Sequence, residues 1–220
     1  MRLPDLPVTQ ALPELRAALQ QGHAVLTAPP GSGKTSVVPL ALLDESWLQG
    51  RRILMLEPRR PAARMAARRL ARIAGGEPGG LVGYQVRLDR RIGAGTRIEV
   101  VTEGILTRRL QSDPTLEEVG LVIFDEFHER NLQADLGLAL CLDVCAGLRD
   151  DLRLLPMSAT LDAAPLCDLL EARHVAASGR QYPVEIRYLD AQDRREPLQA
   201  LPALVRQALR KSARDILVFL

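Results

Sequence analysis

Aromatic side chains are scarce in this chain of 220 residues. They make up 3% of the sequence, with one tryptophan, Trp47. Proteins that hold single-stranded nucleic acid by its bases stack those bases on several aromatic side chains. We therefore expect no base-stacking platform, and any contact with nucleic acid should not read its sequence.

Cysteine is also rare, and its three copies form no CxxC pair. Cys141 and Cys145 lie one helical turn apart in an apolar stretch, and Cys167 follows later. This pattern favours buried free thiols over a metal site or a disulfide.

Lysine is nearly absent, although the chain has 29 basic residues. Only Lys34 and Lys211 are lysines, the rest are arginines, and the formal net charge is +2. This balance excludes a protein that binds nucleic acid by bulk positive charge. Local arginine clusters remain candidates for phosphate binding, because the guanidinium fork fits phosphate oxygens.

Long apolar runs are missing as well. The first ten residues, MRLPDLPVTQ, lack the apolar core of a signal peptide, and the longest apolar stretch, LGLALCLDVCAGL, contains Asp143. That stretch is too short to span a membrane. With 47% hydrophobic and 25% charged residues, the composition is that of a soluble globular protein, and we expect it in the cytoplasm.

Strand-like apolar runs alternate with helical patterns along the chain. The expected strands are His23–Thr27, Ile53–Glu57, Arg97–Thr102, Leu121–Phe124, Leu152–Met157, Val184–Leu189 and Ile216–Leu220. The expected helices are Ala11–Gln20, Thr35–Leu43, Pro61–Ile73, Gly104–Leu110, Leu132–Cys145, Ala164–Glu171 and Leu198–Lys211. This alternation predicts an α/β fold with a mostly parallel sheet and helices on both faces.

The polar segment SGRQYP, at residues 178–183, indicates a linker. The sequence DILVFL at residues 215–220 looks like a central strand, and the chain stops inside it. A parallel strand without a return connection does not complete a fold. We therefore predict a first domain over residues 1–178, then a linker and the beginning of a second domain over residues 179–220, as the front part of a longer protein.

The stretch VLTAPPGSGKTS follows the first strand and opens a helix, which is the context of a phosphate-binding loop. Backbone N–H groups would bind phosphates, Lys34 would neutralise the β- and γ-phosphates, and Thr35 would hold Mg²⁺. An ordinary Gly-Pro turn is the alternative. The expected nucleotide-binding residues are Ala28, Pro29, Pro30, Gly31, Ser32, Gly33, Lys34, Thr35 and Ser36.

Four residues qualify the phosphate-loop prediction. Ala28 stands where the pattern has glycine, so this position should be extended. Pro29 and Pro30 have no N–H, so the phosphate donors should start after them. Pro39 should kink or interrupt the helix that follows the loop.

The apolar run LVIF ends abruptly in the ionisable residues DEFHER, at residues 125–130. A phosphate loop holds Mg²⁺ from one side, and an acid at the end of a neighbouring buried strand holds it from the other. Asp125 fits that role, with water between it and the ion, and Glu126 would orient and deprotonate the attacking water. A loop of solvated charges is the alternative.

Five ordered motifs resemble superfamily-2 helicases of the DEAH branch. They are AxxGxGKT at residues 28–35, E-P-R-R at 57–60, T-x-G at 102–104, D-E-x-H at 125–128 and S-A-T at 158–160. The resemblance covers nearly the whole chain. It implies a RecA-like P-loop domain of an ATP-dependent RNA helicase, with ATP and Mg²⁺ as cofactors and Lys34, Asp125 and Glu126 as catalytic residues.

The resemblance also implies a nucleic-acid path. In that family the E-P-R-R box grips the nucleic-acid backbone, which assigns Arg59 and Arg60 to phosphates. Thr102 and Gly104 start a helix whose N-terminal N–H groups suit an anion, with Arg108 as an assistant. For the arginines of the helix after E-P-R-R, namely Arg64, Arg68, Arg69 and Arg72, we favour a solvated helix face.

By the same resemblance, the S-A-T box couples ATP turnover to strand movement. This assigns Ser158 and Thr160 to coupling, with His128 as the expected partner of Ser158. No role in this mechanism is assigned to Glu129 or Arg130.

The function expected from the sequence is an ATP-dependent RNA helicase that acts on single-stranded RNA. Helicases of this kind take arginine fingers from a second domain through a Q-R-x-G-R-x-G-R-like box, which these 220 residues do not contain. The chain should then carry only the ATP-binding half, and alone it should be nearly inactive. The alternatives are a non-catalytic fragment that binds nucleotide or RNA, and a P-loop ATPase that acts on another kind of partner.

Overall fold

The computed structural model describes residues 3–159, 162–179, 185–186, 188, 196–211 and 215–218. The chain divides into two compact units, Met1–Arg180 and Gln181–Leu220. The first unit holds the whole sheet and the five motifs described above, whereas the helix α7 (Pro197–Lys211) belongs to the second.

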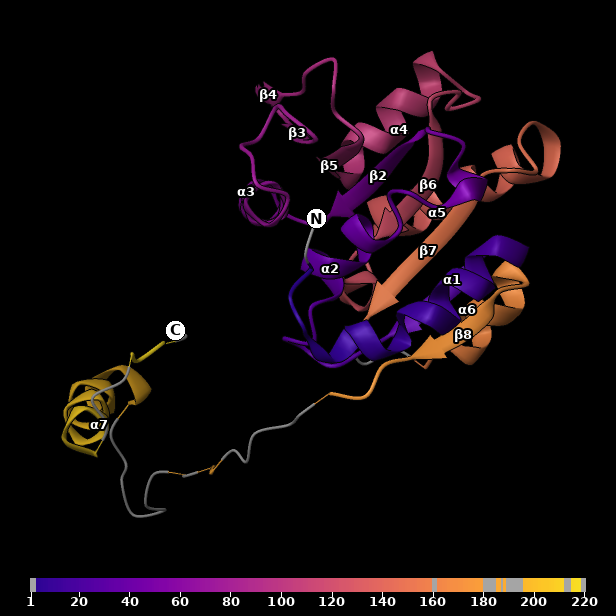
Figure 1. The fold of residues 1–220 in the computed structure, drawn as a ribbon. Coiled ribbons are helices and arrows are strands. Elements are labelled where there is room, and N and C mark those ends of the chain that lie inside the picture. The colour runs from indigo at the N-terminus through magenta and orange to yellow at the C-terminus, as the bar shows by residue number, and fades with distance from the viewer. Residues whose placement is uncertain are drawn as a thin grey trace. The chain divides into compact units, whose positions relative to one another are not determined.

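An eight-stranded sheet forms the centre of the first unit, in the order β4-β3-β5-β2-β6-β7-β1-β8 (Figure 1). Only β4 runs antiparallel to its neighbour. The strands are β1 (Ala24–Thr27), β2 (Arg52–Glu57), β3 (Val82–Val86), β4 (Asp89–Arg91), β5 (Ile98–Thr102), β6 (Val119–Phe124), β7 (Arg153–Ser158) and β8 (Arg173–Ala176). The predicted α/β fold with a mostly parallel sheet is confirmed.

Helices cover both faces of the sheet, as the alternation predicted. One core contains side chains of α1 (Leu12–Gln21), α2 (Lys34–Ala41) and α3 (Arg60–Ile73), and the other those of α4 (Glu103–Ser112), α5 (Leu132–Gly147) and α6 (Ala164–Leu170). Successive residues of a strand point to opposite faces, so Ile53 and Met55 of β2 enter the first core while Leu54 and Leu56 enter the second.

Short 3-10 turns complete the path of the chain. They are η1 (Pro7–Ala11), η2 (Ser46–Leu48) and η3 (Phe127–Glu129). Pro39 lies inside α2, and the helix continues for only two residues beyond it. The three cysteines are free, as predicted, but of the three only Cys141 is buried, whereas Cys145 and Cys167 are partly exposed. Within the described residues, no helix has the length and apolar character needed to cross a membrane.

Three strands escaped the sequence analysis, and two predicted strands differ from the structure. β3 and β4 form a hairpin whose second strand, DRR, is polar, and β8 buries only Val175. None of the three shows a long apolar run. In the predicted strands at 184–189 and 216–220, the described residues 185, 186, 188 and 216–218 lie outside any strand, and the other positions are outside the described residues.

A buried carboxylate ties α4 to the centre of the sheet. Glu99 lies in β5 with its side chain 2% exposed, where Arg52 of β2 approaches Oε1 at 3.0 Å and Arg109 of α4 approaches Oε2 at 2.6 Å. Both arginines are partly exposed. This triad fixes the helix that begins at the T-x-G box against two strands.

We expect Glu99→Ala to destabilise the domain by about 2–3 kcal/mol, because it leaves two arginines facing each other without their shared carboxylate. Glu118→Gln is the matched control, since Glu118 contacts the same Arg52 at 3.4 Å but is 74% exposed. It should change the free energy of unfolding by less than about 0.5 kcal/mol. Urea unfolding of both variants decides this, and equal effects would contradict a special role for Glu99.

Candidate functional site

The phosphate loop lies between β1 and α2, and its backbone needs glycine at two positions. Gly31 and Gly33 have φ of +74° and +99°, values that side chains with a Cβ rarely adopt. Gly33 caps the N-terminus of α2, and a Cβ there would lie 2.7 Å from Leu6 Cδ1. The N-terminal segment therefore packs directly on the loop, and Val8 N–H donates to Ser32 O at 3.0 Å.

Polar groups inside the loop are buried and partly unsatisfied. Lys34 is 4% exposed, and its Nζ donates to Ala28 O at 2.8 Å. Ser32 is 2% exposed, and its hydroxyl has no hydrogen-bond partner among the described residues. Because leaving a buried hydroxyl unpaired is costly, this loop is suited to receive a polar ligand. Ser36 is buried in the first turn of α2, whereas Pro30 and Gly31 are exposed at the rim.

The predicted acid at the end of β6 meets the phosphate loop. Asp125 is 3% exposed, and its Oδ2 accepts a 2.5 Å hydrogen bond from Thr35 Oγ1. Its other oxygen accepts from the backbone N–H of Glu126 at 2.9 Å. A hydroxyl and a carboxylate thus lie together at the first turn of α2, and both are oxygen ligands of the kind that Mg²⁺ prefers.

Glu57 is a site residue that the sequence analysis did not single out beyond its box. It ends β2, the strand beside β6, and its buried side chain is hydrogen-bonded to Asp125. Burial and the adjacent Asp125 carboxyl raise the pKa of Glu57 to about 9, so its carboxyl is protonated at neutral pH. Burial also raises the pKa of Asp125, to about 6. Knowledge of the strand pairing would have predicted Glu57 as a site residue, because neighbouring parallel strands end at the same edge of the sheet.

Glu126 opens the 3-10 turn η3 in a left-handed conformation, with φ of +50°. Its side chain is 35% exposed, and Oε2 lies 3.4 Å from His128 Nδ1. Glu126 also lines a cavity of about 520 Å³ together with Thr35 and Glu57. The turn therefore presents a carboxylate to the space beside the phosphate loop.

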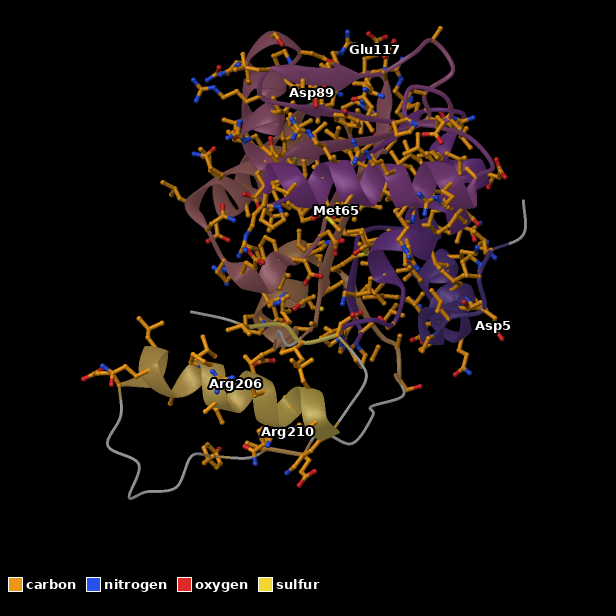
Figure 2. The ribbon with its side chains drawn as sticks, turned by 90° about the vertical axis from the view of Figure 1, so that its left-hand side faces the viewer. Asp5, Met65, Asp89, Glu117, Arg206 and Arg210 are labelled. Atoms are coloured by element: carbon orange, nitrogen blue, oxygen red, sulfur yellow. The ribbon has the colours of Figure 1, made fainter. Side chains whose placement is uncertain are left out.

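The same cavity is lined on its other side by α3, which carries the exposed Met65 (Figure 2). The α3 side chains that line it include Arg68, Arg69 and Arg72. All three are exposed, as the solvated-face interpretation expected, but they also line the same cavity as Glu126. Arg64 differs, because its Nε pairs with Asp89 Oδ2 at 2.9 Å.

The two boxes assigned to nucleic acid lie at neighbouring strand ends. β2 and β5 pair in register from Ile53 and Ile98 to Glu57 and Thr102, which brings the starts of α3 and α4 to the same edge of the sheet. Arg59 and Arg60 are exposed at the start of α3. At the start of α4, Gly104 and Arg108 are exposed, and the half-buried Thr102 makes no side-chain cap. The first turn of α4 is therefore open to a ligand.

The S-A-T box ends β7, which lies between the strands of the phosphate loop and the acid box. Ser158 is fully buried, and its carbonyl accepts from Ala28 N–H at 3.0 Å. Thr160 is outside the described residues. η3 packs against β7, but the side chain recorded beside His128 is that of Glu126. The pairing of His128 with Ser158 therefore stays a prediction.

The segment after the acid box makes contacts that the sequence analysis did not predict. Glu129 Oε2 accepts from Arg59 Nη2 at 3.1 Å. Arg130 pairs with Asp135 at 3.2 Å and lies over the ring of Phe127. No local sequence pattern signals the contact of Glu129 with Arg59, because it joins segments 70 positions apart whose spacing depends on the sheet.

Comparison with known proteins identifies the family of this chain. The model of the DEAD/DEAH box helicase family matches residues 9–169. Over 98% of its length, the chain is 51% identical to the ATP-dependent RNA helicase HrpB of Escherichia coli K12 and 36% identical to the ATP-dependent RNA helicase HrpA of the same strain. It spans 27% of the length of that HrpB and 17% of that HrpA.

Two solved structures share the fold. The E. coli DEAH/RHA helicase HrpB superposes with a TM-score of 0.88 at 50% identity, covering 94% of this chain and 27% of that one. The E. coli DExH-box NTPase HrpB gives a TM-score of 0.82 at 50% identity, covering 96% and 26%. The resemblance to the DEAH branch, which is most specific in GLVIFDEFHERNLQADLGLAL and there points to HrpB, is confirmed. With a RecA-like domain and a family match over most of its length, the chain belongs to the DEAD/DEAH box helicases.

Proposed function

We propose that this chain supplies the nucleotide-binding half of an ATP-dependent RNA helicase, which couples ATP hydrolysis to movement along, or unwinding of, nucleic acid in the cytoplasm. The observation that carries the proposal is the 2.5 Å contact between Thr35 and Asp125. It joins the phosphate loop to the acid box at the sheet edge where the E-P-R-R and T-x-G boxes also lie.

The residues around Thr35 and Asp125 fit a Mg²⁺-nucleotide. Bound Mg²⁺ would neutralise charge on the β- and γ-phosphates, with Thr35 and Asp125 as its protein partners. Among the described residues, no group of three or more His, Cys, Asp or Glu side chains could hold a metal ion by itself. Mg²⁺ at phosphate sites is bound by only one or two protein groups, with phosphate oxygens and water completing its shell. Lys34 and the buried Ser32 hydroxyl would contact the phosphates from the loop.

Glu126 is the proposed general base. Its carboxylate lines the cavity beside Thr35 and is partly open to solvent, so a water molecule can lie between it and a terminal phosphate. Proton transfer to a positioned carboxylate typically contributes about 10²–10⁴-fold. The neighbouring Glu57, held neutral by burial, can donate a hydrogen bond to Asp125 without adding a second negative charge.

The proposed path of the single-stranded RNA follows the exposed ends of β2 and β5. Arg59 and Arg60 would bind the backbone, and the open N-terminus of α4 at Thr102 and Gly104, assisted by Arg108, would bind a further phosphate. Such contacts position the strand without reading its sequence. The relatives named as RNA helicases support RNA as the partner.

We propose that residues 1–178 form the first RecA-like domain and that residues 179–220 form a linker and the beginning of a second. The division into units at Arg180 and Gln181 supports this boundary, as does the much greater length of the relatives. The second domain would provide arginine fingers, and Ser158, Thr160 and His128 would couple turnover to movement.

The rate of ATP turnover with and without single-stranded RNA tests the function in a polypeptide that carries both domains. RNA stimulation supports it, and an RNA-independent rate favours a P-loop ATPase with another partner.

The isolated chain should bind Mg²⁺-ATP but hydrolyse it very slowly. Arginine fingers contribute about 10³–10⁵-fold to turnover in related nucleotide hydrolases, and these 220 residues hold no box that would provide them. Calorimetric titration and a phosphate-release assay on the same sample measure the two properties. Fast turnover that Lys34→Ala abolishes would contradict the division of labour between domains.

Glu126→Gln in the two-domain polypeptide should retain ATP binding and lose hydrolysis. The amide keeps the shape of the side chain but is a far weaker base, so we expect turnover to fall about 10²–10⁴-fold. Asp143→Asn, on an exposed position of α5, is the control and should keep the wild-type rate. A loss smaller than about tenfold at Glu126 would assign the base elsewhere.

Replacing Arg59 and Arg60 together by alanine should weaken binding of single-stranded RNA of any sequence. Removing two phosphate contacts should lower the slope of log affinity against log salt by about 0.7 per contact. Arg90→Ala with Arg91→Ala is the matched control, because these two arginines are also exposed but lie on β4. A salt titration of both double variants decides the question, and an unchanged slope for Arg59 and Arg60 would remove them from the RNA path.

A further inference from the structure

The segment that follows the acid box is attached to both proposed nucleic-acid boxes. On one side Glu129 Oε2 accepts from Arg59 Nη2 at 3.1 Å, which reaches the E-P-R-R box. On the other side Asn131 Nδ2 donates to Glu103 Oε1 at 3.0 Å, which reaches the T-x-G box. The segment that begins at Glu126 therefore makes side-chain contacts with both boxes at which an RNA strand would bind.

The hydrogen bond between Asn131 and Glu103 is expected to stay formed. Glu103 is only 9% exposed. Asn131 also caps α5, because its Oδ1 accepts from Gln133 N–H and Ala134 N–H, each at 3.0 Å. Breaking this contact would leave a buried carboxyl without its partner and would disturb the start of a helix.

The contact of Glu129 with Arg59 is exchangeable. The Arg59 side chain is 71% exposed and that of Glu129 is 35% exposed. Exposed ion pairs of this kind shift an equilibrium by a factor of about five at most. Arginine forms charge-assisted hydrogen bonds with phosphate as well as with carboxylate, so a backbone phosphate can replace this exposed carboxylate at Arg59.

Glu129 is joined to Glu126 through the backbone. The N–H of Glu129 donates to the carbonyl of Glu126 at 2.9 Å, which closes the single turn of η3. The left-handed conformation of Glu126 at the start of this turn depends on its surroundings, since residues with a Cβ rarely adopt it. The position of Glu129 therefore bears on the direction in which the Glu126 side chain points.

We propose that Glu129 competes with nucleic-acid phosphate for Arg59 and thereby couples RNA binding to the acid box. Without RNA, the Arg59–Glu129 pair holds η3 in its resting arrangement. When a backbone phosphate binds Arg59, Glu129 is released, and η3 and Glu126 can move. This rests on the proposed function, in which Arg59 binds the RNA backbone. Glu129 is then a positioning residue that acts through Arg59 and Glu126.

A double-mutant cycle on RNA affinity tests the competition. The proteins are the wild-type chain, Glu129→Gln, Arg59→Ala and the double variant, titrated with a labelled single-stranded oligouridylate at low salt. Glu129→Gln should bind up to about fivefold more tightly than wild type, because Arg59 no longer has a competing partner. In the Arg59→Ala background the same substitution should change nothing.

Asp135→Asn is the matched control for charge. Asp135 forms an exposed ion pair of similar length, 3.2 Å, with Arg130 on the same segment, and its neutralisation should leave RNA affinity unchanged. If Asp135→Asn tightens binding as much as Glu129→Gln, or if the effect of Glu129→Gln persists without Arg59, general charge explains the result and the competition is overturned.

If none of the proteins binds RNA, the proposed function itself fails, and the inference fails with it. RNA binding that is identical with and without Glu129 overturns the inference alone.

The link to the acid box has its own measurement. In the polypeptide that carries both domains, Glu129→Gln should raise ATP turnover without RNA by up to about fivefold. The RNA-saturated rate should not change, so the stimulation by RNA should fall by the same factor. Asp135→Asn should leave both values unchanged. An unaltered ratio of RNA-stimulated to basal turnover in Glu129→Gln would overturn the transmission to Glu126.

Discussion

The hydrogen bond between Thr35 and Asp125 is the contact around which the site is built. It joins residues 90 positions apart in the sequence. Their strands, β1 and β6, are not neighbours, because β7 lies between them. The loop after β1 must therefore reach over the end of β7, and the hydrogen bond from Ala28 to the carbonyl of Ser158 marks that crossing. The sheet order thus explains why the S-A-T box lies beneath the phosphate loop.

Burial of charge is the cost of this arrangement. Lys34, Glu57 and Asp125 are each less than 5% exposed, and burying ionised groups is unfavourable unless they are paired. The domain limits the cost by hydrogen bonds to Asp125 from Thr35 and Glu126, and by keeping Glu57 protonated. Selection for folding alone would favour apolar residues here, so the buried charges point to a ligand.

The sequence predicted those features that depend on local pattern. Buried strands such as β2 and β6 show long apolar runs, and the phosphate loop and acid box have characteristic spacings. β4 and β8 could not be recognised, because edge strands bury few side chains and need no apolar run. The pairing of Glu57 with Asp125, and of Arg59 with Glu129, depends on which strands are neighbours. Strand order is a property of the whole sheet, and local spacing does not encode it.

The most direct test of the account is a calorimetric titration of this chain with ATP, with Mg²⁺ and with EDTA, for the wild type and for Asp125→Asn. If Thr35 and Asp125 together form the Mg²⁺-nucleotide site, the wild type should bind ATP more tightly with Mg²⁺ than with EDTA. Asp125→Asn should lose most of that difference while remaining folded. Equal Mg²⁺ dependence in both proteins would contradict the assignment of Asp125 and, with it, the central contact of the site.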